Sequence, residues 1–197
     1  MMTNSVDATA EPKPTSGGRI TAVQFSVLMS DHLDIVWRLA SYLSRGASEA
    51  EELVERCAQL AFARRSTLVS SIGFKPWFLG LLVESWQEAA PRNLRLMGDG
   101  PEASLGDAYA LAEAAGALQL ADPAAAIVEK LTAEDICQAL SRLSVEDRVV
   151  TALSLADDLS YREIGLVLAL SAEAVRSRLH RGRAVLKVAV WEASQPC

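Results

Sequence analysis

The chain has 197 residues, 50% of them apolar, and a formal net charge of −6 at pH 7. This apolar share can build a buried core and excludes a chain that is disordered throughout, while the net acidity means that any surface for nucleic acid has to be local. Helix-forming residues dominate, aromatic residues make up only 6%, and no segment shows sustained strand alternation, so we expect an all-α protein.

The first residues give a prediction about location. Residues 1–20 lack the basic start and the apolar core of a secretory signal, so we expect a disordered leader and a cytoplasmic protein. The longest apolar run, at residues 77–83, is far shorter than the ~20 residues that cross a bilayer, so no membrane insertion is expected. Widely separated cysteines and histidines give neither a disulfide framework nor metal-ligand spacing, and we expect no metal and no other cofactor. These residues are Cys57, Cys137, Cys197, His32 and His180.

An N-terminal helical domain is predicted over residues 21–96. Apolar residues recur at helical spacing over residues 22–43 and predict one long amphipathic helix, which ends at Arg45-Gly46. A second helix is expected to follow a capping box formed by Ser48 and Glu51. A solvated surface is the interpretation that charge runs usually favour for its outward face, which carries Glu49, Glu52, Glu55 and Gln59.

A third helix of this domain is predicted around an aromatic stretch. Pro76 suits the first turn of a helix that runs to about Ala90, where Pro91 ends or bends it. Trp77 and Trp86 are interpreted as anchors of the helical core. Stacking of either ring on nucleic-acid bases is the less favoured alternative.

Residues 97–130 change character and are predicted to form a flexible linker between two domains. Glycine and proline interrupt an alanine-rich sequence that, over residues 97–129, has six acidic residues and no basic one. A weak helix over residues 107–120 is expected there. The acidity should keep this linker away from nucleic acid.

Four short amphipathic helices are predicted in a C-terminal domain over residues 131–192, enough for a small independent core. Thr132 with Asp135 marks the start of the first helix, and Ser144 precedes the second. The last two helices have the spacing of a helix-turn-helix motif.

The helix-turn-helix pattern lies within residues 159–187. Ser160 and Glu163 form a capping box, so one helix should begin at Tyr161, and Ser171 can cap the next after a short connection. From residue 174 to 187 the second helix has five basic residues and no acidic one. This charge favours an anionic partner, and the second helix of such a motif lies in the major groove of DNA. An amphipathic helix whose arginines only face solvent is the alternative.

Helical spacing assigns the faces of this basic helix. The residues expected to face the core are Val175, Leu179, Ala184 and Leu186. The residues expected to point outward, with guanidinium groups suited to guanine or phosphate, are Arg176, Ser177, Arg178, His180 and Arg181. The sequence has no Gly-rich phosphate loop and no paired nucleophile and base, so an enzyme is not expected.

Three motifs stand out in the C-terminal domain, LSVEDR at 143–148, LSYREI at 159–164 and VRSRLHR at 175–181, and LSYREI followed by VRSRLHR is the specific pair. Together with the order of the two domains, they resemble bacterial RNA polymerase sigma factors of the extracytoplasmic-function (ECF) type. The resemblance covers about residues 25–96 and 122–187. It implies the two-domain helical fold of that family.

The resemblance also implies a function. Such a protein binds core RNA polymerase and directs it to promoter DNA, and an anti-sigma factor is a further candidate partner. The C-terminal domain would read the minus-thirty-five element of the promoter duplex through Glu173, Arg176, Ser177, Arg178, His180, Arg181 and Arg183. The N-terminal domain would meet the minus-ten element and dock on the large polymerase subunit through Glu51, Glu52, Glu55 and Gln59. The family role of this acidic face replaces its interpretation as a solvated surface.

The N-terminal domain departs from the family pattern on the helix after its Phe-x-x-Trp signature, where family members usually have arginine, asparagine and aspartate. Glu84 and Glu88 lie there in this chain, and basic residues return only at Arg92 and Arg95. Two glutamates on a face for single-stranded DNA should weaken its binding. Two alternatives stay open: a sigma-like interaction protein that engages polymerase or an anti-sigma factor without opening DNA, and a stand-alone helix-turn-helix regulator.

Overall fold

The computed structural model describes residues 21–68, 73–89, 131–157 and 159–193, and every regular element in this part of the chain is helical. The all-α fold predicted from the sequence is thus confirmed. The predicted leader, the linker with its weak helix, and Pro91 lie outside the described residues. The elements are α1 (Ala22–Asp31), α2 (Leu33–Leu43), α3 (Ala47–Ala63), the short 3-10 helix η1 (Arg65–Thr67), α4 (Phe74–Ala89), α8 (Ala133–Ser141), α9 (Val145–Ala156), α10 (Tyr161–Leu168) and α11 (Ala172–Ala193).

The segment predicted as one long first helix is two helices, so that prediction is wrong. α1 and α2 are separated at His32, which has φ −113° and ψ 5°. The His32 N–H bonds the carbonyl of Met29 (3.2 Å), and its Nδ1 lies 2.8 Å from the carbonyl oxygen of Leu28. The His32 ring lies 5.3 Å, centroid to centroid, from the ring of Phe74. Helical periodicity does not report this tertiary contact, because apolar spacing continues across the break.

The start of α3 differs from the predicted capping box of Ser48 and Glu51. The helix already begins at Ala47, after Gly46, which makes no side-chain cap. The carboxylate of Glu49 accepts the backbone N–H of Arg45 at 2.7 Å. This contact provides an acceptor for a backbone donor ahead of the helix. The buried residues of α3 are Ala50, Leu53, Cys57 and Ala61.

An aromatic cluster joins α4 to α1 and α3. α4 has Pro76 in its first turn, as predicted. The ring of Phe25 lies edge-on to three other rings at centroid distances of 5.7 to 6.2 Å, those of Phe62, Phe74 and Trp77. Trp86 is buried and its Nε1–H donates to the carbonyl of Leu43 at 3.0 Å. Both tryptophans therefore contribute to the packing of the N-terminal helices.

The C-terminal helices begin at the predicted caps. Thr132 and Asp135 form a capping box before α8, and the Ser144 hydroxyl accepts the N–H of Asp147 at 3.2 Å before α9. α11 crosses α9 closely at Gly182, where a Cβ would overlap the side chain of the buried Thr151. Glycine is therefore required where these two helices meet.

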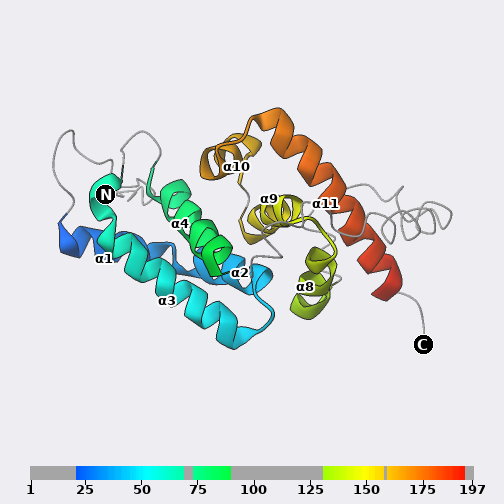
Figure 1. Cartoon of the computed structure of the whole chain (residues 1–197), viewed down its shortest axis with the longest axis horizontal. Coiled ribbons are helices and arrows are strands. Elements are labelled where there is room, and N and C mark those ends of the chain that lie inside the picture. Colours follow the sequence, from blue (N-terminus) through cyan, green and yellow to red (C-terminus); the bar gives the residue numbers. More distant parts are fainter. Residues whose placement is uncertain (1–20, 69–72, 90–130, 158, 194–197) are drawn as a thin grey trace, which may run out of the picture.

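The N-terminal helices α1–α4 and the C-terminal helices α8–α11 pack against each other. Figure 1 shows α10 next to α4 and α9 next to α2, with α11 on the side away from α1. Lys75 Nζ on α4 lies 2.8 Å from Asp157 Oδ2, just after α9. Arg38 Nη1 on α2 donates to the carbonyl of Ala156 at 2.8 Å. The sequence predicted two domains, but it did not predict that their helices dock.

Further contacts between the two groups of helices involve Arg148 and Cys137. The Arg148 guanidinium lies 6.0 Å from the ring centroid of Trp86. Burial, and then the charge of Arg45, lower the pKa of Arg148. Cys137 Sγ lies 3.2 Å from the carbonyl oxygen of Ser41, an acceptor on α2. Polar groups on several helices therefore fix how the two groups meet.

Candidate nucleic-acid interface

α10 and α11 form a helix-turn-helix whose ends are fixed by local hydrogen bonds. Ser160 Oγ accepts the N–H of Glu163 (3.3 Å), and the Glu163 carboxylate accepts the N–H of Ser160 (2.8 Å). α10 ends at Ala169, which has φ 53° and ψ 41° in the left-handed region. Ser171 Oγ then accepts the N–H of Ala174 at 3.1 Å and caps α11. The predicted helix start, short connection and second cap are confirmed.

The faces of α11 follow the predicted pattern in most positions. The residues expected in the core are all buried: Val175, Leu179, Ala184 and Leu186. The polar residues exposed on the first turns of the helix are Glu173, Arg176, Ser177, His180 and Arg181. Arg178 and Arg183 are half-buried instead. We call the exposed set, from Glu173 to Arg181, the reading face; its contact with DNA stays a prediction.

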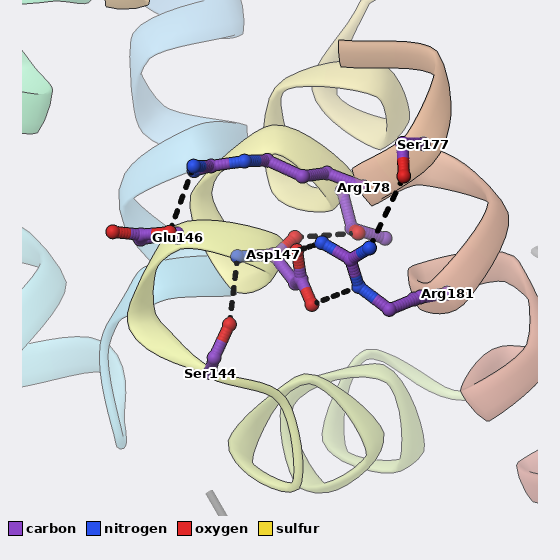
Figure 2. Close-up of polar contacts among 7 residues, drawn as sticks. Ser144, Glu146, Asp147, Ser177, Arg178 and Arg181 are labelled. Atoms are coloured by element: carbon purple, nitrogen blue, oxygen red, sulfur yellow. Dashed lines mark hydrogen bonds and ion pairs between the residues drawn. The ribbon is translucent and has the colours of Figure 1, made fainter. Parts of the chain in front are cut away.

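Arg181 is held by a carboxylate from α9. Its Nε and Nη2 donate to Asp147 at 2.8 and 2.7 Å, and its Nη1 donates to Ser177 Oγ at 3.2 Å. Figure 2 shows one edge of the guanidinium aligned with the Asp147 carboxylate. The Asp147 side chain is 11% exposed and that of Arg181 is 53% exposed. A bidentate pair of this kind fixes the plane of the guanidinium as well as its position.

Arg178 has a different environment. Its Nη2 lies 2.8 Å from Glu146 Oε2, and the two side chains are 22% and 63% exposed, respectively. Figure 2 shows the side chain of Arg178 extended away from that of Arg181. One contact to an exposed carboxylate constrains a guanidinium less than a two-point contact to a buried one.

Asp147 and Glu146 are the partners that sequence reasoning missed. Both lie in the first turn of α9, where acidic residues are common because they favour the positive end of the helix dipole. The helix dipole alone therefore explains acidic residues at these two positions, and nothing in the local sequence indicated arginine partners. Only the crossing of α9 and α11 brings them to the arginines, and no spacing rule within one helix reports that crossing.

The acidic surface of α3 lies within the described residues. Glu51, Glu52, Glu55 and Gln59 are all exposed, and Gln59 Nε2 donates to Glu55 Oε1 at 3.1 Å. Arg56 is exposed between them. We call these four residues the acidic face; its contact with polymerase stays a prediction.

The face of α4 expected to meet single-stranded DNA is partly covered, with Gln87, Glu88 and Ala89 still exposed. Val83, Ser85 and Trp86 are buried, and the Glu84 carboxylate accepts both bonds from Arg64 Nη1, at 2.9 and 2.7 Å. A Cβ on Gly80 would lie 3.6 Å from the carbonyl oxygen of Val167 on α10. Much of the helix therefore faces protein in this arrangement.

Two further classes of site are not seen among the described residues. In residues 21–68, 73–89, 131–157 and 159–193, no group of three or more His, Cys, Asp or Glu is placed to hold a metal ion. Within the same ranges, no helix has both the length and the apolarity needed to cross a membrane.

Comparison with known proteins finds similarity to bacterial sigma factors. The family model described as Sigma-70, region 4 matches residues 133–186, which lie in α8 to α11. The ECF RNA polymerase sigma factor SigE of Mycolicibacterium smegmatis is 28% identical over 190 residues, or 92% of this chain and 69% of that relative. The solved structure of CnrH in complex with the cytosolic domain of CnrY matches with a TM-score of 0.60 at 18% identity, covering 89% of this chain and 92% of that chain.

These matches agree with the motifs and with the geometry of the helix-turn-helix. The region 4 match includes α10, the first turns of α11 and the α9 carboxylates that hold its arginines. The relative covers nearly the whole chain, and the fold match includes both groups of helices. Residues 133–186 therefore match Sigma-70 region 4, and nearly the whole chain is similar to an ECF RNA polymerase sigma factor.

Proposed function

We propose that this protein binds core RNA polymerase in the cytoplasm and directs it to specific promoters, without an enzymatic activity of its own. The observation that carries this proposal is the reading face on α11, which presents Arg176, His180 and Arg181 on a chain of net charge −6. In a helix-turn-helix, this part of the second helix enters the major groove. We infer that the reading face contacts the minus-thirty-five element.

Polymerase supplies much of the affinity in this proposal. Phosphate contacts by Lys and Arg dominate the affinity of proteins for DNA, and the reading face offers few of them. The acidic face of α3 is exposed and repels DNA, so it suits a basic protein surface. We infer that Glu51, Glu52, Glu55 and Gln59 dock on polymerase and that α11 adds promoter selection.

Reconstituted transcription with purified core polymerase tests this proposal. The protein is expected to direct a transcript from a cognate promoter found by sequencing the products made from genomic fragments. Arg176→Ala should reduce that transcript about tenfold or more, because one base or phosphate contact contributes about 1–3 kcal/mol. Arg162→Ala removes an exposed arginine from α10, outside the reading face, and should leave the transcript unchanged. No transcript from any fragment would contradict the proposal.

Arg178→Ala sharpens the assignment of the reading face. It is expected to weaken promoter binding less than Arg176→Ala, because Arg178 is half-buried and paired with Glu146. Polymerase binding, measured by co-purification, should stay intact in both variants. Equal loss of promoter and polymerase binding would mean that this helix has been assigned the wrong partner.

The acidic face has its own test. Glu52→Lys should weaken co-purification with core polymerase, because it reverses a charge at the centre of the face. Glu134→Lys on α8 makes the same change at an exposed position outside the acidic face and serves as the matched control. Equal effects of the two variants would show that only net charge matters, and would remove α3 from the proposed interface.

A second function is favoured by one observation, the enclosure of α4 by α10. A protein in this docked form would engage polymerase, or an anti-sigma factor, with the part of α4 next to α10 kept from DNA. CnrH was solved in complex with the cytosolic domain of CnrY, which makes a protein partner that holds the docked form a reasonable alternative. Binding to polymerase with no transcript from any promoter would favour this function.

A further inference from the structure

Asp147 is a nearly buried carboxylate beside a surface assigned to DNA. It lies in the first turn of α9, and its side chain is 11% exposed. Its two oxygens accept from Nε and Nη2 of Arg181, at 2.8 and 2.7 Å. Its backbone N–H is bonded by Ser144 and its carbonyl by Thr151, so the position of this residue is fixed independently of Arg181.

Arg181 is the member of the reading face that this carboxylate constrains. A flexible arginine loses side-chain entropy when it binds, and a guanidinium held in one plane before binding loses less. Ser177, itself on the reading face, adds a contact at Nη1 (3.2 Å). Arg181 is therefore oriented from two sides by its own protein, whereas Arg178 has a single contact to an exposed glutamate.

We propose that Asp147 is a positioning residue that sets the promoter selectivity of Arg181. It fixes the plane in which the guanidinium meets the edge of a base, so that one base is favoured over the others at that position. The inference rests on the proposed function, because it assumes that α11 reads a promoter. A carboxylate close to DNA also repels phosphates, so Asp147 raises selectivity while it lowers the attraction to DNA of any sequence.

A purely structural role makes a different prediction. If the ion pair only holds α11 on α9, its loss lowers the melting temperature and weakens binding to all DNA sequences alike. A positioning role predicts opposite changes: selectivity falls, while binding to non-promoter duplex stays the same or rises. Selectivity among bases is thus the readout that a structural role does not change.

The test uses holoenzyme assembled from core polymerase and the full chain, with competition binding to promoters in which each base of the minus-thirty-five element is changed in turn. Asp147→Asn keeps the shape of the side chain and removes its charge. Glu146→Gln makes the matched change at the neighbouring residue, in the exposed pair with Arg178. Arg181→Ala and the double variant Asp147→Asn/Arg181→Ala complete a cycle that isolates the coupling of the two residues.

We expect Asp147→Asn to reduce base preference about tenfold, and at the same positions where Arg181→Ala removes it, in line with the discrimination that one bidentate contact gives. Glu146→Gln should leave these preferences unchanged. In the Arg181→Ala background, Asp147→Asn should cause no further loss. If Asp147→Asn does not fold, Asp147→Glu, which keeps the charge but displaces the guanidinium, should change the same preferences.

An unchanged preference profile in a folded Asp147 variant would overturn the inference, and so would independent effects of the two residues in the cycle. If Arg181→Ala leaves the profile intact, Asp147 has no DNA contact to position and the inference fails, while the proposed function stands as long as the wild-type holoenzyme selects promoters. If the wild-type holoenzyme shows no selection, the proposed function itself fails.

Discussion

Helix α4 and the first turns of α11 are the two segments that the family resemblance assigns to promoter DNA, and their surroundings differ. The middle of α4 is enclosed, with Val83 and Trp86 buried and Gly80 close to the backbone of α10. The reading face of α11 is exposed. In the docked arrangement, the C-terminal segment is therefore accessible to a duplex, whereas the N-terminal segment is accessible only at its end, at Gln87, Glu88 and Ala89.

The ion pairs of the two helices explain part of this difference. On α4, Lys75 pairs with Asp157 of the C-terminal group, so its charge ties the helix to protein. On α11, Arg181 pairs with Asp147 of its own group and still keeps 53% of its side chain exposed. The two ion pairs thus have different consequences. The Lys75–Asp157 pair joins α4 to the C-terminal helices, whereas the Asp147–Arg181 pair orients an arginine that stays exposed.

The proposed function requires the two groups of helices to separate. The minus-ten and minus-thirty-five elements are about 25 base pairs apart, which is on the order of 85 Å of duplex at about 3.4 Å per base pair. A helix that packs against α10 cannot lie that far from the neighbouring α11. The docked arrangement and the promoter-bound arrangement must therefore differ.

The largest effect is expected for Gly182→Ala, which would displace the reading helix. The added Cβ would overlap the hydroxyl oxygen, the Cβ and the methyl carbon of the buried Thr151 side chain. Overpacking of this kind costs about 1–3 kcal/mol, and a helix crossing has little room to relax, so we expect a loss near 3 kcal/mol. The free energy of unfolding in urea measures it.

Thr151→Ala provides the control for this variant. It removes two of the three atoms that the new Cβ would meet, so the double variant Gly182→Ala/Thr151→Ala should recover part of the loss. Gly80→Ala, at a helix position where a Cβ has an ordinary contact at 3.6 Å, should change stability much less. Strictly additive single and double variants would show that the close crossing is not the cause.

A smaller effect is expected for Lys75→Glu, which acts on the enclosure of α4. The change replaces an ion pair, 2.8 Å long and 29% and 28% exposed, by two like charges. Docking of the two groups should weaken by about 1–2 kcal/mol, because partly buried pairs are less screened than surface pairs. Small-angle scattering should then report a larger radius of gyration.

The charge-exchanged variant Lys75→Glu/Asp157→Lys restores opposite charges and should return the radius toward that of the wild type. Lys187→Glu, on α11, makes the same charge change away from the α4–α10 contact and should leave the radius unchanged. An unaltered radius in Lys75→Glu itself would mean that apolar contacts alone hold the two groups together.

The sequence predicted the elements that local chemistry decides. The starts of α8, α9, α10 and α11 were found because a Ser or Thr side chain caps each of them within three residues. The buried and exposed faces of α11 followed from helical spacing, except at Arg178, which Glu146 of another helix holds. Features that depend on residues of a single helix, such as its cap and its buried face, could be predicted from residue spacing alone.

The misses have a common cause in contacts between distant segments. The break at His32 accompanies the packing of its ring on Phe74, and the enclosure of α4 depends on α10. Asp147 looked like an ordinary acidic residue at a helix start until α11 was placed against it. Residue spacing within a segment holds no information on which other segment will pack there.

The smallest predicted effect concerns Cys57, which lies on α3 beneath α4, with its Sγ 3.8 Å from the carbonyl oxygen of Phe78. Burial raises the pKa of this thiol from 9.0 to about 12. Below pH 9 the thiol is neutral in both states, but between pH 9 and 12 it ionises only on unfolding, so stability falls as the pH rises. At pH 9.5 we expect a loss of about 0.8 kcal/mol relative to pH 7 from this group.

Other groups also titrate in this range, so the test is the difference between the wild type and Cys57→Ala. Both proteins should lose stability above pH 9, and the wild type should lose more, with the gap in unfolding free energy changing by the amount assigned to the thiol. Cys137→Ala is the comparison variant, because this thiol is only half-buried. Its pKa is raised mainly by burial and then by the charge of Glu134. Parallel pH profiles for the wild type and Cys57→Ala would mean that water reaches the thiol. The contact between α3 and α4 at Cys57 would then be looser than the structure shows.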